Sequence, residues 1–561
     1  MIGRVLNFGS AFNPLLPRCI CVTAIFSAAV HLLFRKHEPT IFEYIYFQSA
    51  PFFLLRFLGL TSASSLSAIA LLNLFLGTQI IFYRLAWHHL RKFPGPKIAA
   101  ITQGWILKET YSGRTRFTMK KLTEKYGDWV RIGPNELLTT STEALGTILG
   151  PKGWPKGSSY DSGITKSSCG GDSVLTIKTL SEHAKRRRIW DKAFTQKAIF
   201  GYLPSIEVRI EQLMDVVEDN IKRGEDVDLC LQIGYFVYDT MCDMAFGSTG
   251  AADLLKTQKD EHHILEQMGR VVQQAGILRN VPWLTPLVKI WPSAQTKEQV
   301  AFREFTKTMF LKRWKQGLGK QIDVFHYLLG EDTETGTRLT ISELAADSTL
   351  LIITGADTTR MVLIAFFMYL LQDRGCMEKL RGELEAASDL SPPTLSQLPY
   401  LNACLYETMR LQPPSPSNIQ RVCPPGDAVI DGFFIPEGTK VRFSMFAMHR
   451  DKRYFDYPDE FRPERWLKKT ENPFEKSFAK NTGEKLNEKA FFPFLIGPGS
   501  CVAKSLAWLE MRLVAANLIS NYEISFGNGF DPHAFENTWT DAYLLMIKEP
   551  LKVKFSHRLK D

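Results

Sequence analysis

The most hydrophobic stretch of the chain lies near its N-terminus. No charged residue occurs from Phe57 to Tyr83, and Leu, Ile, Phe, Ala and Ser dominate these positions. A helix needs about 20 apolar residues to cross the hydrocarbon core of a bilayer, and this stretch exceeds that length. A cleavable signal peptide would be shorter and nearer the start of the chain. The pattern therefore predicts a transmembrane helix and favours it over a buried core helix, which rarely stays uncharged for so long.

Two further apolar segments precede this helix and leave the number of membrane spans open. Cys19 to Phe34 is borderline in length, and Ile41 to Leu55 is apolar but carries Glu43. Basic residues follow the first and the last apolar segment, and the positive-inside rule places both groups in the cytosol. Three spans satisfy this rule and two do not, so we expect three within residues 1–92, with a single anchor at 57–83 as the alternative. The basic residues are Arg35, Lys36, Arg84, Arg91, Lys92 and Lys97.

A short proline-rich segment, Phe93-Pro94-Gly95-Pro96, follows the apolar region. Two prolines that flank a glycine cannot continue a helix. We therefore expect a rigid linker at residues 93–97, followed by one folded domain at residues 98–561.

The rest of the chain has the pattern of a mainly α protein with a small β part. Ile341–Leu371 contains no proline and few charges, which predicts a long central helix that is buried nearly all round. Val130–Ile132 and Val429–Phe446 have the alternation and the turn residues of short strands. No βαβ pattern with a GxGxxG turn is present, which argues against a Rossmann domain. Helices are also predicted at Met119–Tyr126, Glu207–Ile221, Tyr400–Leu411 and Leu506–Ile519.

Composition and charge narrow the class of protein further. With 561 residues, 45% hydrophobic and 23% charged, the chain can bury a large core. The net charge of +9 suits an anionic membrane or an acidic partner. We expect no nucleic acid as partner, because no binding motif accompanies the one dense basic run, Lys185–Arg188. The nine cysteines lack CxxC or Cys/His spacing, which argues against a disulfide scaffold and a structural zinc site and indicates a reducing compartment.

Cys501 lies in the segment with the clearest chemistry. A glycine-rich turn, Phe494-Leu-Ile-Gly497-Pro-Gly499-Ser, precedes it, and an apolar helical run follows it. A cysteine just before a helix meets the positive end of the helix dipole, which favours the thiolate. The two glycines let the backbone approach a metal and turn its amides toward sulfur. The alternative for any single cysteine is a buried, inert thiol.

This segment resembles the haem-binding loop of the cytochrome P-450 family, F-x-x-G-x-R-x-C-x-G. Phe494, Gly497 and Cys501 match, whereas Gly499 stands where the family usually has Arg and Ala503 where it usually has Gly. The resemblance implies that Cys501 is the axial ligand of the iron in haem b, iron protoporphyrin IX. Four further motifs match in the family's order, and the resemblance covers about residues 94–550.

Two of these motifs involve Glu407-Thr-Met-Arg410 and Arg465. Positions three apart share a helix face, so Glu407 and Arg410 can bond directly. Such a pair alone is a weak signal, because exposed pairs are common and contribute little. The resemblance implies a structural network of Glu407, Arg410 and Arg465 on the haem side of the core.

A third motif, Thr354-Gly355-Ala-Asp357-Thr358-Thr359, lies within the predicted central helix. It resembles the family's A-G-x-D/E-T-T, with Thr354 in place of Ala. An acid and a hydroxyl in an apolar helix are costly unless they have partners or a function. The resemblance implies that the helix opens at Gly355 for dioxygen, and that Asp357 and Thr358 deliver protons to it. A capped or kinked core helix is the alternative.

The fourth motif contains His183 and Arg187, where the family has W-x-x-x-R. The resemblance implies that Arg187 binds a haem propionate, a use that suits a guanidinium group. Arg421 stands at a second family position for a propionate. The alternative for this basic run is a solvated face, which fits Lys185 and Arg186.

The resemblance implies a reaction and a location as well as a fold. We expect a fungal, membrane-bound monooxygenase that inserts one oxygen atom from O2 into a lipophilic small molecule, such as a terpenoid or a polyketide of secondary metabolism. Electrons would come from NADPH through NADPH–cytochrome P-450 reductase, whose acidic docking face suits the basic surplus. The catalytic domain would face the cytosol at the endoplasmic reticulum. The alternatives are a haem-thiolate isomerase or dehydratase that uses no O2, a non-catalytic haem-binding protein, and an interaction protein without haem.

Overall fold

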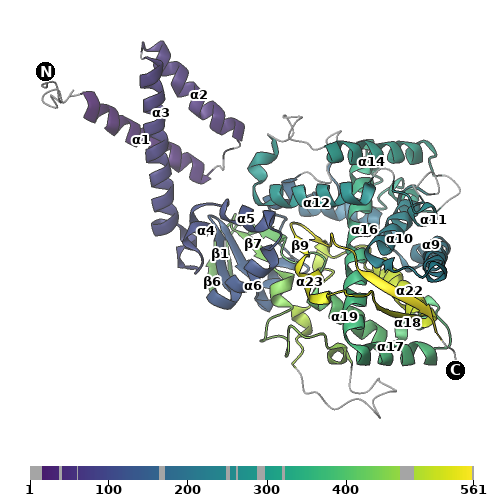
Figure 1. Cartoon of the computed structure of the whole chain (residues 1–561). Helices are drawn as coiled ribbons and strands as arrows, with labels where there is room; N and C mark the ends of the chain where they lie inside the picture. The colour runs from purple at the N-terminus through teal and green to yellow at the C-terminus, as the bar shows by residue number, and fades with distance from the viewer. Residues whose placement is uncertain are drawn as a thin grey trace, which may run out of the picture.

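The computed structural model consists of a group of N-terminal helices that stands apart from a large, mainly helical body (Figure 1). It describes residues 15–36, 39, 41–59, 61–162, 171–247, 253–260, 263–286, 297–318, 322–467 and 485–558. The N-terminal group contains α1 (Leu15–Lys36), α2 (Ile41–Phe57) and α3 (Ser62–Phe82). A single α-helix, α3, leads from this group to the body.

The strongest predicted span begins five residues later than the hydropathy pattern indicated. Phe57 is the last residue of α2, and α3 begins at Ser62, where the Thr61 side chain accepts a hydrogen bond from the Ser64 amide. By length and composition, two described helices could span a membrane, Ser62–Trp87 and Ile341–Gln372. Only 17% of the first is buried against 78% of the second, so the first suits a membrane and the second a protein core.

Polar side chains join the three N-terminal helices. Asn73 of α3 exchanges two hydrogen bonds with Gln48 of α2, both 2.9 Å long. Gln79 of α3 donates to the hydroxyl of Ser27 of α1 over 3.0 Å. Interhelical hydrogen bonds of this kind hold helices together in apolar surroundings. The three helices therefore pack as a unit, and how many of them cross the membrane stays a prediction.

The Pro/Gly linker is packed against the body. Phe93 is buried beside Trp129, and the Pro94 carbonyl accepts a 2.7 Å hydrogen bond from the amide of Arg131. A Cβ atom at Gly95 would lie 2.3 Å from the Arg131 carbonyl oxygen, so glycine allows this close approach. Residues 93–95 thus pack against the helical body.

The central helix of the body is α16 (Ile341–Gln372), as predicted. Thr340 and Glu343 form a capping box at its start, which satisfies the first amide groups of the helix. It packs against α10 (Leu229–Phe246), α19 (Pro399–Leu411) and α22 (Lys504–Asn521). The other helices of the body are α4 (Lys97–Ile101), α5 (Trp105–Tyr111), α6 (Thr115–Tyr126), α7 (Thr142–Leu149), α8 (Leu180–Ala193), α9 (Gln196–Arg223), α11 (Leu254–Thr257), α12 (Ile264–Asn280), α14 (Lys297–Lys315), α15 (Val324–Leu328), α17 (Arg374–Ala386), α18 (Pro392–Gln397), α20 (Met445–Met448) and α23 (Pro532–Asn537).

The described strands form four small, separate sheets. The largest sheet has the order β1 (Trp129–Gly133), β2 (Glu136–Thr139), β7 (Lys440–Phe443) and β4 (Ile419–Val422), with β2 and β7 parallel. The β4 strand brings Ile419 and Arg421 to the cavity described below. The remaining strands are β3 (Val227–Asp228), β11 (Lys552–His557) and β8 (Tyr522–Phe526), the pair β5 (Ala428–Ile430) and β6 (Phe433–Ile435), and the pair β9 (Thr540–Asp541) and β10 (Leu545–Met546). In Figure 1, β1, β6 and β7 lie near the end of α3, and the C-terminal strands, in yellow, lie beside α22. The predicted fold class, mainly α with a small β part, is confirmed.

Candidate active site

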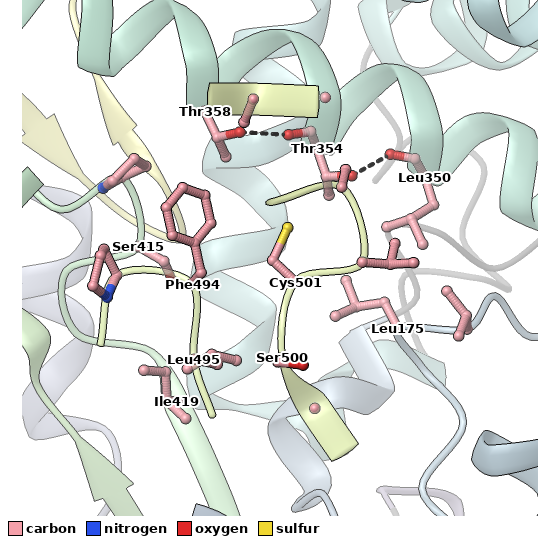
Figure 2. A pocket seen from close by; sticks show the side chains of 18 of the residues that line it. Leu175, Leu350, Thr354, Thr358, Ser415, Ile419, Phe494, Leu495, Ser500 and Cys501 are labelled. Atoms are coloured by element: carbon pink, nitrogen blue, oxygen red, sulfur yellow. Dashed lines mark hydrogen bonds between the residues drawn. The ribbon is translucent and has the colours of Figure 1, made fainter. Parts of the chain in front are cut away.

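A cavity lies between α16 and the loop that carries Cys501 (Figure 2). In Figure 2 the sulfur of Cys501 points up toward the turn of α16 that carries Thr354 and Thr358. Apolar side chains such as Leu175, Leu350 and Phe494 make up much of the wall. Residues from β4, α8, α10, α12 and α22 complete it, so the site gathers segments from most of the body.

The loop before Cys501 is held by its own backbone. The Cys501 amide donates to the Phe494 carbonyl over 2.8 Å, and the Ser500 amide donates to the Gly497 carbonyl over 3.0 Å. Gly497 has a φ of +65°, and a Cβ atom there would lie 2.2 Å from the Leu149 carbonyl oxygen. Only glycine fits this position. Gly497 therefore shapes the loop from outside the cavity, while Phe494 and Cys501 line it.

The Cys501 thiol is the accessible one among the described cysteines. Cys230, Cys242, Cys376, Cys404 and Cys423 are buried, whereas Cys501 is exposed toward the cavity. Protein encloses Cys501 on its other sides, and this burial raises the pKa of its thiol. The Ala503 amide, Arg187 and Lys504 oppose that rise by stabilising the thiolate. A metal ion bound to the sulfur would remove the proton outright.

Three of the predicted cofactor-binding residues meet beside this loop. Arg187 of α8 donates to the Ser500 carbonyl over 2.5 Å and pairs with Asp191 over 2.7 Å. Arg421 of β4 donates to the hydroxyl of Tyr160 over 3.1 Å. His183 is buried in the same wall, and burial, Lys156 and the two arginines lower its pKa to about 3. His183 is therefore neutral near pH 7.

The structure gives a reason for glycine at position 499. The φ angle of Gly499 lies outside the left-handed region, so backbone strain does not require glycine. A Cβ atom at this position would instead lie 2.7 Å from Nη2 of Arg421. Glycine thus lets the Arg421 guanidinium rest against the loop, close to the place from which an arginine at 499 would extend.

Sequence reasoning missed Lys156. Its ammonium group donates to the carbonyl groups of Val174 and Leu175, over 3.0 and 2.8 Å, and it lines the cavity. Burial, Arg421, Arg187 and Arg279 lower the pKa of Lys156 to about 7. A lysine in a loop carries no sequence signal for such a position, because only the fold brings these cations together.

The predicted proton-delivery residues lie on one turn of α16 but face different ways. Among the described residues, Thr354, Gly355 and Thr358 line the cavity and Asp357 does not. Thr358 Oγ1 donates to the Thr354 carbonyl over 2.8 Å, and the helix continues without a break. Burial raises the pKa of Asp357 to about 6, against the influence of Arg360.

Gly355 also has a packing role. A Cβ atom there would lie 2.4 Å from the terminal carbon of Met241 on α10. Glycine therefore allows α10 to approach α16 at the level of the cavity, where both residues are part of the wall.

A second residue that sequence reasoning missed is Glu510 of α22. Its side chain is 2% exposed and lines the cavity. One carboxyl oxygen accepts a 3.2 Å hydrogen bond from Thr359, and the other has no hydrogen-bond partner among the described residues. Burial raises the pKa of Glu510 to about 8, so it is protonated and neutral at pH 7. The apolar run around it hid this acid in the sequence.

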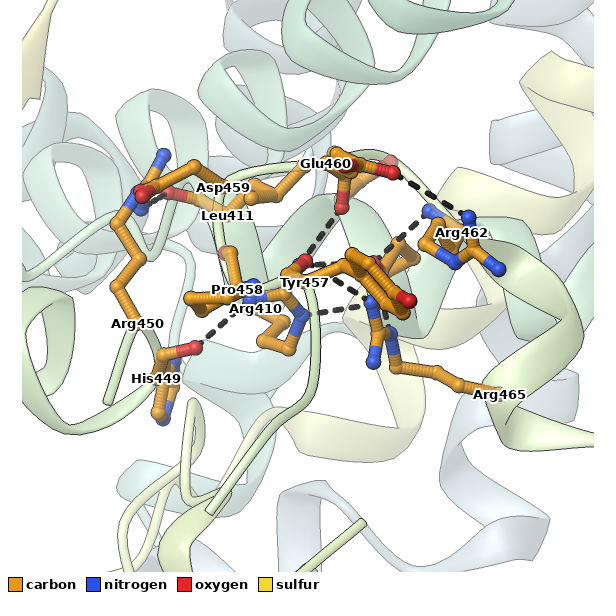
Figure 3. Close-up of polar contacts among 12 residues, drawn as sticks. Arg410, Leu411, His449, Arg450, Tyr457, Pro458, Asp459, Glu460, Arg462 and Arg465 are labelled. Carbon is orange, nitrogen blue, oxygen red and sulfur yellow. Dashed lines mark hydrogen bonds and ion pairs between the residues drawn. The ribbon is translucent and has the colours of Figure 1, made fainter. Parts of the chain in front are cut away.

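The structure brings Glu407, Arg410 and Arg465 into one buried network, and Figure 3 shows the two arginines. Arg410 makes two 2.8 Å hydrogen bonds to Glu407, and Arg465 makes one of 3.1 Å. Burial opposes the ionisation of Glu407, but Arg410 and Arg465 outweigh it and lower the pKa of this carboxyl. Further bonds from Arg410 reach the carbonyl groups of His449, Pro458 and Glu460, as Figure 3 shows. The network thus ties α19 to the segment at 449–465.

The solvated-face interpretation of the basic run is wrong for Arg186. Its side chain is buried and pairs with Asp347 over 2.9 Å and with Glu343. Arg186 lies on the face of α8 that is directed toward α16, where its partner acids lie. These acids are far away in the sequence. Lys185 is exposed and pairs with Glu182, as expected for a solvated face.

These residues fit a haem with a thiolate ligand. The one accessible described thiol faces the cavity, and Arg421 and Lys156 line the wall without a carboxylate partner in the described part of the chain. Comparisons with known proteins agree with this. The family model of cytochrome P-450 matches residues 94–555, and the chain belongs to this family. It is therefore a haem-dependent monooxygenase, an oxidoreductase.

Several similar proteins are fungal cytochromes P-450. The chain is 64% identical over 533 residues to cytochrome P-450 67 of Uromyces fabae. The aligned region covers 95% of this chain and 98% of the relative. It is 31% identical to the cytochrome P-450 monooxygenase phqL of Penicillium fellutanum, over 86% of this chain and 82% of the relative. It is 29% identical to the tryprostatin B 6-hydroxylase of Neosartorya fischeri, over 81% and 80% of the two chains. Together with the N-terminal apolar helix, the family indicates a membrane-anchored protein.

Proposed function

We propose that the chain inserts one oxygen atom from O2 into a lipophilic small molecule, with electrons from NADPH delivered by NADPH–cytochrome P-450 reductase. The observation that carries this proposal is the position of Cys501, whose sulfur faces Thr358 across a largely apolar cavity. A haem held by this sulfur would supply dioxygen activation, because a thiolate ligand favours O–O cleavage.

Residues of this chain would bind the haem and transfer protons within the cavity. Arg187, Arg421 and Lys156 would hold the propionates, with neutral His183 beside them. The Thr358 hydroxyl can exchange its bond to the Thr354 carbonyl for one to a ligand or water in the cavity. Asp357, with a pKa of about 6, can take up and release a proton near neutral pH.

The substrate would reach this site from a membrane. We expect three membrane spans, the endoplasmic reticulum as location, and the catalytic domain on the cytosolic side. The net charge of +9 suits the acidic docking face of a reductase. A secondary metabolite such as a terpenoid or polyketide fits the apolar wall, and one relative is named a hydroxylase of tryprostatin B.

Two substitutions test the reaction. Cys501→Ala should abolish the thiolate-type absorption of the reduced carbon monoxide complex, whereas Cys423→Ala, a buried cysteine outside the cavity, should retain it. Thr358→Ala should bind haem but release peroxide in place of product as it consumes NADPH with the reductase. A thiolate-type band in Cys501→Ala would contradict the assignment, and an unchanged product yield per NADPH in Thr358→Ala would contradict the proton relay.

Protease protection in sealed microsomes tests the topology. A tag at residue 1 should be protected and a tag at residue 561 should be digested. A protected C-terminus would contradict the proposed orientation, and an exposed N-terminus would contradict three spans.

A further inference from the structure

The cavity holds more positive charge than a haem can balance. Its wall contains Lys156, Arg187, Arg279 and Arg421, and its one lining carboxylic acid, Glu510, is neutral at pH 7 because its pKa is about 8. Asp191 neutralises Arg187. Among the described residues, the other three cations have no ion pair. The two propionates of haem match two of them, and a propionate beside Lys156 would raise its pKa from about 7 and keep it charged, so one cation remains.

The position of each cation shows which one remains. Arg421 rests against Gly499 of the cysteine loop, and Lys156 lies opposite Arg421 in an isolated β-bridge. Both are therefore on the cofactor side. Arg279 comes from the end of α12, and its Nη2 donates to the Asn418 carbonyl over 2.9 Å. Among the described residues, no hydrogen bond or ion pair joins Arg279 to the cysteine loop.

The Arg279 side chain is buried and fixed in place, as expected for a group that binds a ligand. Its side chain is 3% exposed, and the guanidinium carbon lies 4.6 Å from the ring centre of Tyr160 and 4.2 Å from that of Tyr543. Its Nε is buried and has no hydrogen-bond partner in the described part of the chain. Burying a cation without a counter-charge is costly, so this arrangement favours an anion that the chain itself does not provide. The two rings fix the guanidinium plane, which reduces the entropy lost when a ligand binds.

Arg279 also lies in the walls of two cavities. It lines the haem cavity and, in addition, a larger cavity whose walls include Tyr83, Arg84 and His88 at the end of the membrane helix α3. A lipophilic molecule that came to the site from this second cavity would meet Arg279 before Cys501. The walls beyond it are apolar, with Leu175, Leu350 and Val362 among them.

We propose that Arg279 binds the carboxylate of the substrate, and that the substrate is therefore a lipophilic carboxylic acid. A guanidinium group matches a carboxylate with two parallel hydrogen bonds. A single surplus cation suits the single charge of a carboxylate better than the nearly double charge of a phosphate monoester. The apolar wall then receives the body of the acid, and the anchored end determines which carbon faces the iron. This inference rests on the proposed function, because it concerns the molecule oxidised in this cavity.

Matched ligands test the proposal on the full-length holoenzyme. Palmitic acid with methyl palmitate, and abietic acid with methyl abietate, present the same apolar body with and without the charge. Binding is measured by the haem spectral shift and by equilibrium dialysis without NADPH or reductase. At least one acid should bind the wild type about ten- to a hundredfold more tightly than its ester. Equal binding of acid and ester in both pairs would overturn the proposal.

Variants locate the preference at Arg279. Arg279→Gln should keep its haem content and lose the preference for the acid, and Arg279→Lys, which keeps the charge but not the fork, should retain part of it. Arg421→Gln is the matched control on the cofactor side, and it should lose haem while any remaining holoenzyme keeps the preference. Loss of haem in Arg279→Gln comparable to that in Arg421→Gln would show that Arg279 holds a propionate and would overturn the proposal. If Arg279→Gln does not fold, an unchanged acid preference in Arg279→Lys is the overturning result. A preference for acids without NADPH-dependent oxidation would contradict the proposed function and leave this inference standing.

Discussion

Two clusters of buried charge lie in the same domain and differ in their balance. In the Glu407 cluster, the carboxylate of Glu407 meets Arg410 and Arg465, and Trp466 and the Arg462 amide complete its hydrogen bonds. In the cavity cluster, Lys156, Arg279 and Arg421 have no carboxylate among the described residues. A buried charge is tolerated when a partner compensates for its lost hydration. The first cluster has its partners within the chain and supports the fold, whereas the second requires partners that arrive as ligands.

The largest effect is expected for Glu407→Gln, which removes the acid from the balanced cluster. Arg410 and Arg465 would remain buried without a counter-charge, which costs about 3–5 kcal/mol. Denaturant unfolding of the variant measures this loss. Glu124→Gln, at an exposed acid that pairs with Lys120, should change stability by no more than about 0.5 kcal/mol. A loss below about 1 kcal/mol for Glu407→Gln would remove the distinction between the two clusters.

The opposite behaviour is expected for Arg421→Ala in the unbalanced cluster. One of several mutually repelling cations is removed, so the fold should tolerate the change, while a propionate loses a partner. Haem affinity should fall about ten- to a hundredfold, as expected for the loss of a charged hydrogen bond. Haem content per folded protein and the rate of haem transfer to a haem acceptor measure the effect. Arg374→Ala, at an exposed arginine of α17, is the control, and full haem retention in Arg421→Ala would refute this role.

The pH dependence of haem affinity should report on Lys156. Its pKa is lowered to about 7 by burial, Arg421, Arg187 and Arg279, and a propionate beside it would raise that value. Below pH 7 the lysine is charged with or without haem, so affinity should be independent of pH. Above pH 7 haem binding must take up a proton, so affinity should fall by up to about tenfold per pH unit. Lys156→Met should bind haem more weakly and lose this slope, and Lys152→Met, at an exposed position of the same segment, should keep it. If the dependence of haem affinity on pH persists in Lys156→Met, another titrating group causes it.

The smallest effect is expected for Gly499→Arg. The backbone accepts a side chain there, but the new Cβ would lie 2.7 Å from Nη2 of Arg421, so the two arginines would compete for one place. The single variant should fold and lose some haem, and the double variant Gly499→Arg with Arg421→Ala should recover it. A coupling energy of about 1 kcal/mol in this double-mutant cycle is expected, and strictly additive effects would contradict the shared site.

The parts of the site that the sequence predicted have local signatures. Glu407 and Arg410 lie three residues apart on a helix, so their contact follows from helix geometry alone. Cys501 follows a glycine turn and precedes a helix. Its sulfur points into the cavity, toward α16. Thr358 was placed in the long apolar helix because a run of that length with no proline and few charges forms a buried helix. In contrast, Arg186 was misread, because its partners Asp347 and Glu343 lie more than 150 residues away.

The sequence by itself determined the apolar helix α3, the central helix α16 and the cysteine whose sulfur faces the cavity. These follow from periodicity and short-range motifs, which act within a few turns of the chain. Only the tertiary structure decided that Lys156, Arg279 and Arg421 converge, that Glu510 lies in the same wall, and that Gly499 makes room for Arg421. These groups come from separate loops, helices and strands, and each is ordinary in its own neighbourhood. These groups affect one another's charge only when packing brings them into one low-dielectric cavity. The electrostatic interaction between two charges depends on their distance in space and on their burial.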